Sequence, residues 1–316
     1  MKKIEQKDLF ELKNVSQPVV AGGDIFFTET KMNEKKNTYE TAIYKYTNEG
    51  KVAYGDDGTV NSSLQVSPDG KWISFVSNEG EDKTPQLKIQ AVSGGKAIAL
   101  TQEKKGVSIY VWGKDSKSIF YQTTKADEEE KKEEFPQPII VEKITYRFDG
   151  GTFLPNKETT QIKQVEVSTK EVKTLFETED SIFFRDVLHD GGSLVVDRDL
   201  SNIRWSLDSA EACYVDVATG DIHPILEAGT DESYRYMLDS KEGVILAYNS
   251  GEHGFVTQVD IVFNKEGQPG SEGSILNLTS GLDVEWGDWL VADFQQSVTG
   301  VEPQWMDKDS FLISAS

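Results

Sequence analysis

A hairpin signal with a Gly or Asp at its corner recurs along this chain and constrains its fold more than any other feature. The clearest copy is segment 64–76, LQVSPDGKWISFV, where a strand end, a Ser-Pro-Asp-Gly turn and a second strand follow one another. Pro68 fixes φ at the first corner of the turn, and the Asp69-Gly70 pair supplies a residue that tolerates positive φ. The strand that begins at Trp72 is apolar on both faces, which is typical of a sheet covered on both sides.

Weaker copies of the same signal follow at regular spacing. The turn anchors are Gly22, Asp69, Asp115, Asp190, Asp239 and Asp307. The successive differences between these numbers are 47, 46, 75, 49 and 68. Three of them are close to the ~40–50 residues of one four-stranded propeller blade. The two longer intervals predict blades that carry insertions.

A second hairpin pattern lies between the anchors, so each repeat contains two hairpins. Its copies span residues 42–55, 87–101, 162–176, 213–226 and 257–279. One sheet of four strands cannot bury both of its faces, so neighbouring sheets must stack around an axis. The prediction is an all-β fold, a β-propeller of four-stranded antiparallel blades that forms a single domain over residues 1–316. About five blades are complete and a sixth is begun.

The last predicted strand, 311–314, has no partner strand after it. Propellers pair their terminal strands, because open sheet edges invite aggregation. We therefore expect a fragment of a longer protein. The alternative is that the N-terminal strand completes the last blade.

Composition narrows the possible partners. The formal net charge of −21 repels phosphate, so nucleic acid and anionic lipid are poor partners. High solubility is the simplest consequence, and attraction of basic peptides is the alternative. The N-terminus has no apolar core of a secretory signal, and no apolar run reaches the ~18 residues that span a bilayer. We expect a cytoplasmic protein.

The single cysteine and the three histidines give no sign of a metal or redox site. Cys213 lies in a run of alternating apolar and polar residues, which favours a buried structural thiol over a nucleophile. Because it is the single cysteine, an intramolecular disulfide is excluded. His189, His223 and His253 are scattered without metal-ligand spacing. No metal and no cofactor is expected.

Two insertions, at about 125–160 and 264–300, interrupt the repeat. The first opens with the charge run 125–134, KADEEEKKEE, which predicts a solvated excursion or a short helix, and continues into ITYRFDGGTF at 144–153. There Arg147 is the one candidate for binding a substrate carboxylate, and the alternative is that it pairs with Asp149 or a neighbouring acid. The second insertion is rich in Trp and acidic residues, which favours core packing at a blade junction over a peptide-binding surface.

Several segments, taken in order, resemble a known family. They are KI at 3–4, DLFEL at 8–12, VSQP at 15–18, SPDG at 67–70, YRFDGG at 146–151, and LT at 278–279 with Asp283, GD at 287–288 and PQW at 303–305. This ordered set is similar to the N-terminal β-propeller of acylaminoacyl-peptidase-like serine peptidases of the prolyl oligopeptidase family. The SPDG turn alone is shared with TolB-like propellers.

The resemblance implies a seven-bladed propeller that caps a C-terminal α/β-hydrolase domain and admits only short or unfolded peptides. That domain would carry a Gly-x-Ser-x-Gly nucleophile elbow followed by Asp and His. No such motif occurs in these 316 residues, so the hydrolase domain is expected to be absent from this chain and no catalytic residue is assigned to it. The function expected from the resemblance is a non-catalytic propeller that controls peptide access to the peptidase domain of the same polypeptide.

Two other functions are compatible with the sequence. One is a stand-alone TolB-like or WD40-like propeller that acts as a protein-interaction scaffold. The other is a glycosidase with paired inward carboxylates, which the 54 Asp and Glu residues permit but no motif supports. The coding sequence after Ser316 separates the peptidase from the scaffold.

Overall fold

The computed structural model describes residues 3–56, 60–80, 82–126, 138, 140–147, 158–188, 192–240, 242–254, 257–265, 275–284, 286, 303–307 and 310–313. The chain divides into two compact units. The first unit contains the residues up to Thr123 together with Lys163–Lys173. The second contains Thr124–Ile162 and most of the chain after Thr174.

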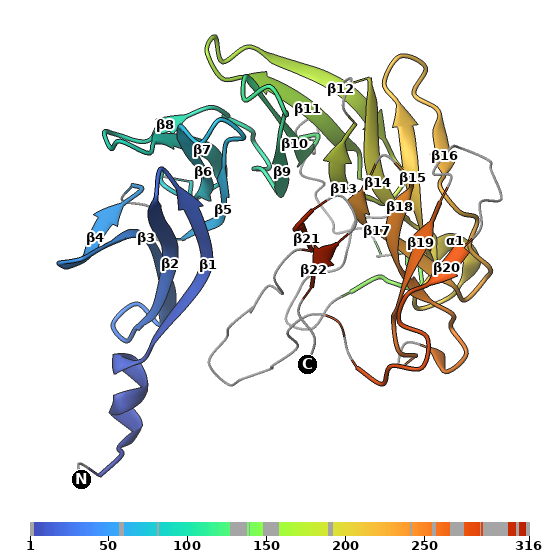
Figure 1. Cartoon of the computed structure of the whole chain (residues 1–316), viewed down its shortest axis with the longest axis horizontal. Coiled ribbons are helices and arrows are strands. Elements are labelled where there is room, and N and C mark those ends of the chain that lie inside the picture. Colours follow the sequence, from blue (N-terminus) through green and yellow to red (C-terminus); the bar gives the residue numbers. More distant parts are fainter. Residues whose placement is uncertain are drawn as a thin grey trace. The chain divides into compact units, whose positions relative to one another are not determined.

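Two four-stranded antiparallel sheets form most of the first unit (Figure 1). A 3-10 helix, η1 (Gln6–Glu11), precedes them. The first sheet has the order β1-β2-β3-β4, with strands β1 (Lys13–Ala21), β2 (Asp24–Asn33), β3 (Thr38–Thr47) and β4 (Gly50–Tyr54). The second has the order β5-β6-β7-β8, with strands β5 (Asn61–Val66), β6 (Trp72–Ser77), β7 (Gln86–Ala91) and β8 (Ile98–Ala99).

The third sheet, which contains strands of both units, has the order β12-β11-β10-β9. Its strands are β9 (Ile109–Trp112), β10 (Ser118–Thr124), β11 (Thr160–Glu166) and β12 (Val172–Thr178). Along the chain, the first insertion separates β10 from β11, the two central strands of this sheet.

The second unit contains two further sheets of the same kind. The fourth sheet consists of β13 (Ile182–Val187), β14 (Ser193–Asp199), β15 (Ala210–Asp216) and β16 (Ile222–Pro224), with the short helix α1 (Ser201–Arg204) between β14 and β15. The fifth sheet consists of β17 (Ser233–Asp239), β18 (Val244–Asn249), β19 (Asp260–Asn264) and β20 (Ile275–Asn277). One parallel bridge, Ala210 to Ser233, links them. A final hairpin pairs β21 (Gln304–Trp305) with β22 (Phe311–Leu312).

The structure confirms the predicted fold class. Each set of four strands consists of two successive hairpins. The described part of the chain holds five such sets, of which the fourth and fifth are joined by one parallel bridge into an eight-stranded sheet, and the opening hairpin of a sixth. Four of the six turn anchors lie in the connection between the first and second strands of a sheet, and Asp239 is the last residue of β17. The sixth, Asp190, lies outside the described residues.

The Ser-Pro-Asp-Gly turn shows why this sequence forms a hairpin. The Ser67 hydroxyl donates to Asp69 Oδ1 at 2.7 Å and accepts the Trp72 N–H at 3.0 Å. Gly70 has a φ of +70°, which a side chain would disfavour, and its N–H donates to the Ser67 carbonyl at 2.8 Å. The side chains therefore fix the turn before any distant contact forms.

Apolar clusters join neighbouring sheets within each unit. In the first unit, Phe26 and Ile43 of the first sheet pack with Ile73 and Phe75 of the second. In the second unit, Val195 and Tyr214 of the fourth sheet pack with side chains of the fifth. The first sheet thus packs against the second, and the fourth against the fifth, as predicted from the repeat.

The first strands of four sheets share a feature that the sequence pattern did not reveal. The pairing register shifts between Ser16 and Val19 in β1, between Ser62 and Gln65 in β5, between Phe184 and Asp186 in β13, and between Tyr236 and Leu238 in β17. Such irregularities re-aim side chains on an edge strand.

Candidate functional site

Arg147, the one binding residue predicted from the sequence, lies in the described segment 140–147 and is exposed. That segment contacts α1, since both the N–H and the hydroxyl of Thr145 donate to Asn202 Oδ1, at 3.1 and 3.0 Å. Asp149, the proposed alternative partner of Arg147, lies outside the described residues. Most of the charge run at 125–134 and of the second insertion does so too.

Cys213 is buried, as predicted. Burial raises the pKa of its thiol to about 12, and the nearby Glu211 adds to the effect. A thiol in this state is a poor nucleophile at neutral pH. Across the described segments, no group of three or more His, Cys, Asp and Glu side chains is arranged to hold a metal ion.

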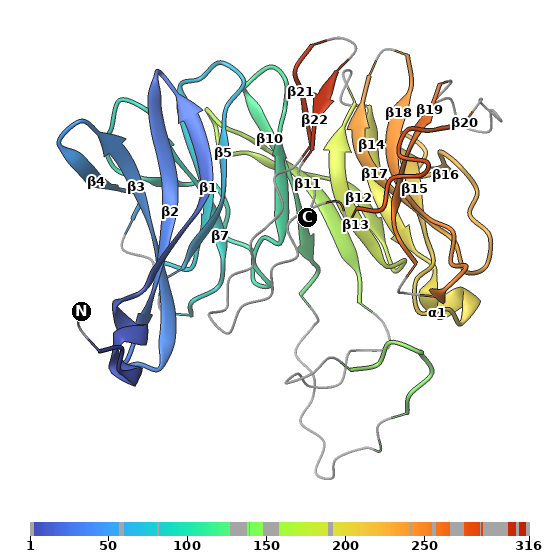
Figure 2. The same ribbon diagram turned by 60° about the horizontal axis from the view of Figure 1, so that its bottom comes forward.

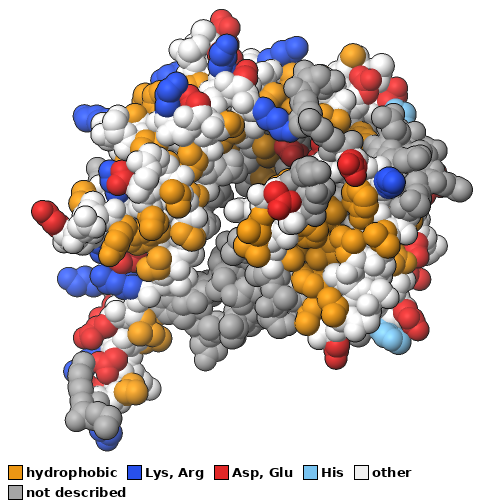
Figure 3. Space-filling view, viewed as in Figure 1, with side chains coloured by type: hydrophobic (Ala, Val, Ile, Leu, Met, Phe, Trp, Pro, Cys, Tyr) orange, Lys and Arg blue, Asp and Glu red, His pale blue; other side chains and the backbone are white. Residues whose placement is uncertain are grey.

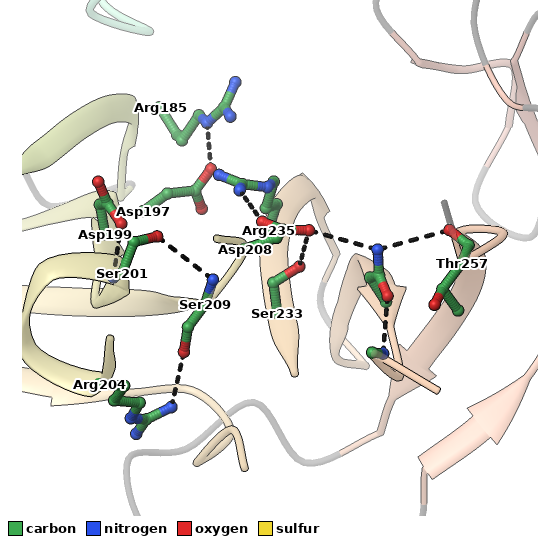
Figure 4. A network of polar contacts seen from close by, with 12 residues as sticks. Arg185, Asp197, Asp199, Ser201, Arg204, Asp208, Ser209, Ser233, Arg235 and Thr257 are labelled. Atoms are coloured by element: carbon green, nitrogen blue, oxygen red, sulfur yellow. Dashed lines mark hydrogen bonds and ion pairs between the residues drawn. The ribbon is translucent and has the colours of Figure 1, made fainter. Parts of the chain in front are cut away.

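The strongest candidate for a binding site is a network of hydrogen bonds and ion pairs that joins the fourth and fifth sheets (Figure 4). The first half of this network is a pair of charged residues. Arg185 on β13 donates from Nε to Asp197 Oδ2 on β14 at 2.6 Å. Asp197 is almost fully buried, and its Oδ1 accepts the backbone N–H of Tyr236 at 2.8 Å. The carboxylate thus links the fourth sheet to the fifth and holds Arg185 by one edge of its guanidinium group.

The second half of the network repeats this arrangement. Arg235 on β17 donates from Nη2 to Asp208 Oδ1 at 2.7 Å. Asp208 lies in the connection between β14 and β15, and its Oδ2 accepts from the Ser233 hydroxyl and from Asn249 Nδ2, both at 3.3 Å. Each arginine is therefore positioned by an acid of the fourth sheet that has other partners as well.

The two guanidinium groups act on the same carboxylate. Burial raises the pKa of Asp197, and the attraction of Arg185, the Tyr236 N–H and the attraction of Arg235 offset part of that rise. The Phe183 ring, 44% exposed, lies 4.4 Å from the Arg185 guanidinium carbon. The arrangement combines two charged donors with an exposed aromatic face, which suits the binding of an anion attached to an apolar group.

Sequence reasoning missed both arginines. Their acidic partners lie 12 and 27 residues away, and no motif marks such pairs. A weak signal was present, because each arginine follows an aromatic residue on a first strand and precedes a turn anchor, by five residues for Arg185 and four for Arg235. Aligning the repeats on their anchors places the two arginines one position apart.

A second feature of the same unit is an exposed apolar surface, which we call the α1 surface. Its large side chains are Ile140, Val141, Tyr146, Ile203, Trp205 and Leu207. Figure 2 shows segment 140–147 and α1 at the same end of the unit, and the bond from Thr145 to Asn202 ties them together. Figure 3 shows further hydrophobic side chains exposed over the region of β17–β20.

The turn that follows α1 holds Trp205 in an unfavourable backbone conformation. Trp205 has a φ of +53° and is 67% exposed. A bulky residue adopts this left-handed region only where its surroundings enforce it. Here Arg204 donates to the Gly229 carbonyl and to Glu211 Oε1, both at 2.8 Å, and the Ser206 N–H donates to the Ser201 carbonyl at 3.2 Å. The fold therefore braces a turn that presents tryptophan to solvent.

Comparison with known proteins identifies the fold of the chain but assigns it to no sequence family. No family model matches the chain, and no curated protein matches it. Among solved structures, the uncomplexed acylaminoacyl peptidase of Pyrococcus horikoshii matches with a TM-score of 0.65 and 19% identity, over 90% of this chain and 42% of that one. The β-propeller domain of the Trilobed protease from Pyrococcus furiosus, described as having an open velcro topology, matches with a TM-score of 0.55 and 16% identity, over 87% of this chain and 75% of that one.

A third solved structure is a putative TolB from Agrobacterium tumefaciens. It matches with a TM-score of 0.51 and 13% identity, over 84% of this chain and 80% of that one. The chain therefore has a β-propeller fold. More closely, it has the fold of the propeller domains of acylaminoacyl peptidases, and it spans about 42% of the length of the Pyrococcus horikoshii peptidase that it matches. In the part of the chain that is described, no helix is long and apolar enough to cross a membrane.

Proposed function

We propose that this chain is the non-catalytic propeller domain of a larger peptide hydrolase, in which it controls the access of peptides to a catalytic domain. The observation that carries the proposal is the comparison with the Pyrococcus horikoshii peptidase, because the match uses 90% of this chain and leaves more than half of the peptidase unmatched. The absence of a nucleophile-elbow motif from the sequence agrees with a division of labour between two domains.

The propeller would act by size exclusion, admitting short or unfolded peptides and keeping folded proteins from the nucleophile. The net charge of −21 supports a preference for peptides with a free or basic N-terminus, because an acidic surface raises their local concentration. In this proposal Arg147 contacts the substrate.

The α1 surface supports the presence of a partner domain. Six large apolar side chains are exposed there, and one of them is a tryptophan held in a strained turn. Exposed apolar patches on one face mark interaction sites, and buried tryptophans commonly dominate the energy of such interfaces. We assign the α1 surface to contact with the catalytic domain of the same polypeptide.

The proposal is tested on the intact product of the gene. We expect that product to hydrolyse acyl-amino-acid or dipeptide chromogenic substrates and a fluorophosphonate probe to label a serine outside residues 1–316. Residues 1–316 alone should give no turnover and no labelling. A stop codon directly after Ser316, or an intact product without peptidase activity, would refute the proposal.

The α1 surface is tested by the double substitution Ile203→Ser and Trp205→Ser in the intact product. We expect its stability to fall by about 2–3 kcal/mol through lost burial, while residues 1–316 alone keep their Tm. The matched control is Ile275→Ser, an exposed residue of β20 in the same unit. Equal effects of the double substitution on the intact product and on the single domain would contradict the assignment.

For Arg147, we expect Arg147→Ala to raise KM in the intact product while leaving kcat unchanged, because a binding contact is lost and the reacting groups are not touched. Steady-state kinetics on several peptides measure this. Unchanged kinetics on all of them would remove Arg147 from the site.

The second candidate function is a stand-alone interaction scaffold. The comparison with the putative TolB favours it, because that match spans 80% of the other chain and leaves no large second domain unmatched. A gene that encodes nothing after Ser316, together with capture of a separate protein through the α1 surface, would favour the scaffold over the peptidase domain.

A further inference from the structure

The two arginines of the network in Figure 4 leave donors unused. Arg185 hydrogen-bonds through Nε alone, and Arg235 through Nη2 alone, as far as the described residues go. Both Nη groups of Arg185, and the Nη1 and Nε groups of Arg235, are therefore open to a ligand. The two side chains are partly exposed, at 28% and 43%.

Each arginine is also oriented in advance. Asp197 is also held by the Tyr236 N–H, and Asp208 by Ser233 and Asn249, so each acid has partners besides its arginine. An arginine fixed by a carboxylate on one edge and open on the other loses little entropy when a second carboxylate binds. Because each charge already has an opposite charge beside it, recognition depends on the direction of the open N–H groups and not on a local positive field.

The aromatic ring beside the arginines narrows the ligand further. Phe183 lies against Arg185 and is 44% exposed, so an apolar side chain attached to a bound carboxylate would meet it. A single small anion would leave that ring uncovered. The combination matches the last residue of a peptide, whose α-carboxylate and side chain leave the same carbon atom.

We propose that Arg185, Arg235 and Phe183 form a binding site for the C-terminal carboxylate of a peptide that ends in an apolar residue. The proposal deepens the proposed function, because it assigns to the propeller one end of the peptides whose access it controls. The guanidinium groups bind the carboxylate, Phe183 contacts the terminal side chain, and Asp197 and Asp208 are positioning residues.

The test measures binding and not turnover, so that it is independent of any catalytic domain. Residues 1–316 are titrated by calorimetry with N-acetyl-glycyl-phenylalanine, with the C-terminal amide of the same peptide, and with sodium acetate. We expect the free acid to bind at least about tenfold more tightly than the amide, since a charged, bidentate hydrogen-bonded pair is lost in the amide. Acetate is expected to bind more weakly than the acid.

Arg185→Lys and Arg235→Lys keep the charge and remove the fork, so each is expected to abolish the preference for the acid. The matched control is Arg198→Lys. Arg198 lies on β14, in the same sheet as Arg185, and pairs with Asp180 at 2.9 Å. Circular dichroism checks the fold of each variant, and if one arginine variant unfolds, the other carries the test.

Equal affinity for acid and amide would overturn the proposal, and so would an unchanged preference in a folded arginine variant. Acetate binding as tightly as the peptide would overturn the assignment to a peptide terminus. The failure of this site and the failure of the proposed function are distinguishable. Loss of the acid preference refutes the site even if the intact product is a peptidase, and a retained preference supports the site even if the gene encodes no hydrolase domain.

Discussion

At the scale of single residues, burial decides which polar groups can do chemistry. The thiol of Cys213 and the phenols of Tyr110 and Tyr236 have raised pKa values because their charged forms are poorly solvated. The arginines of the network keep exposed edges. The groups available for binding are therefore arginines that an acidic partner holds on one side, with Asp197 buried and Asp208 partly exposed.

Cys213 gives a direct check on this burial. We expect the native chain to resist alkylation by iodoacetamide at pH 8, because the thiol is fully buried and its pKa is raised to about 12. After unfolding in guanidinium chloride, one equivalent of label should be incorporated within minutes, and mass spectrometry counts it. Rapid labelling of the folded chain would contradict the described packing of β15.

Glu29 gives a check on electrostatics in the first sheet. Burial raises the pKa of its carboxyl, but hydrogen bonding and attraction from Lys51, with a further contribution from Lys13, bring it below its ordinary value of 4.5. A lowered folded-state pKa gives stability that is present above the unfolded-state pKa and is lost as the pH falls through the folded-state value.

We therefore expect Glu29→Gln to lose about 1 kcal/mol at neutral pH, because both lysines are partly exposed. Its stability should change less than that of the wild type between about pH 5 and pH 3. Urea unfolding at several pH values measures both effects. Parallel pH profiles for the two proteins would show that Glu29 is not the titrating group.

At the scale of elements, turns with local side-chain contacts are predictable from sequence and contacts between strands are not. The side chains of Ser67 and Asp69 form their hydrogen bonds within the turn segment 67–72. The hairpin is therefore predictable from these six residues alone. The irregular register of β13 and β17 depends on which strand lies opposite, and the pairs made by Arg185 and Arg235 depend on neighbouring sheets. The residues of the proposed binding site were therefore missed, although the strands that carry them were predicted.

A substitution at Gly243, in the connection between β17 and β18, tests how closely the strands of the fifth sheet pack. Gly243 has a φ of +155°, and a Cβ there would lie 2.0 Å from the carbonyl oxygen of Asn264 on β19. We expect Gly243→Ala to destabilise the chain by about 3 kcal/mol or more, since backbone cannot move aside as a side chain can. The measurement is the free energy of unfolding in urea.

The control for this substitution is Gly220→Ala. Gly220 also has a positive φ, +78°, but nothing lies within 4 Å of its Cβ position. We expect a cost of about 1 kcal/mol there from backbone conformation alone. Similar costs at the two positions would show that β18 and β19 do not approach as described.

At the scale of the whole molecule, repeat spacing was sufficient to predict the fold. The intervals between anchors correspond to one four-stranded sheet per repeat. Each such sheet must stack on a neighbouring sheet to bury its second face. Solved propellers with less than 25% identity share that architecture with this chain, because many sequences satisfy the same alternation and turn chemistry. Function is less constrained by the fold, since propellers serve as enzyme domains and as scaffolds alike.

The most direct test of the proposed role is a size-exclusion measurement on the intact gene product. One cleavable sequence is presented as a free five-residue peptide and, separately, within an exposed loop of a stably folded protein. If the propeller controls access, hydrolysis of the peptide should proceed while cleavage of the folded protein stays at background, and unfolding the carrier should restore cleavage. Equal rates on the peptide and on the folded carrier would contradict the account.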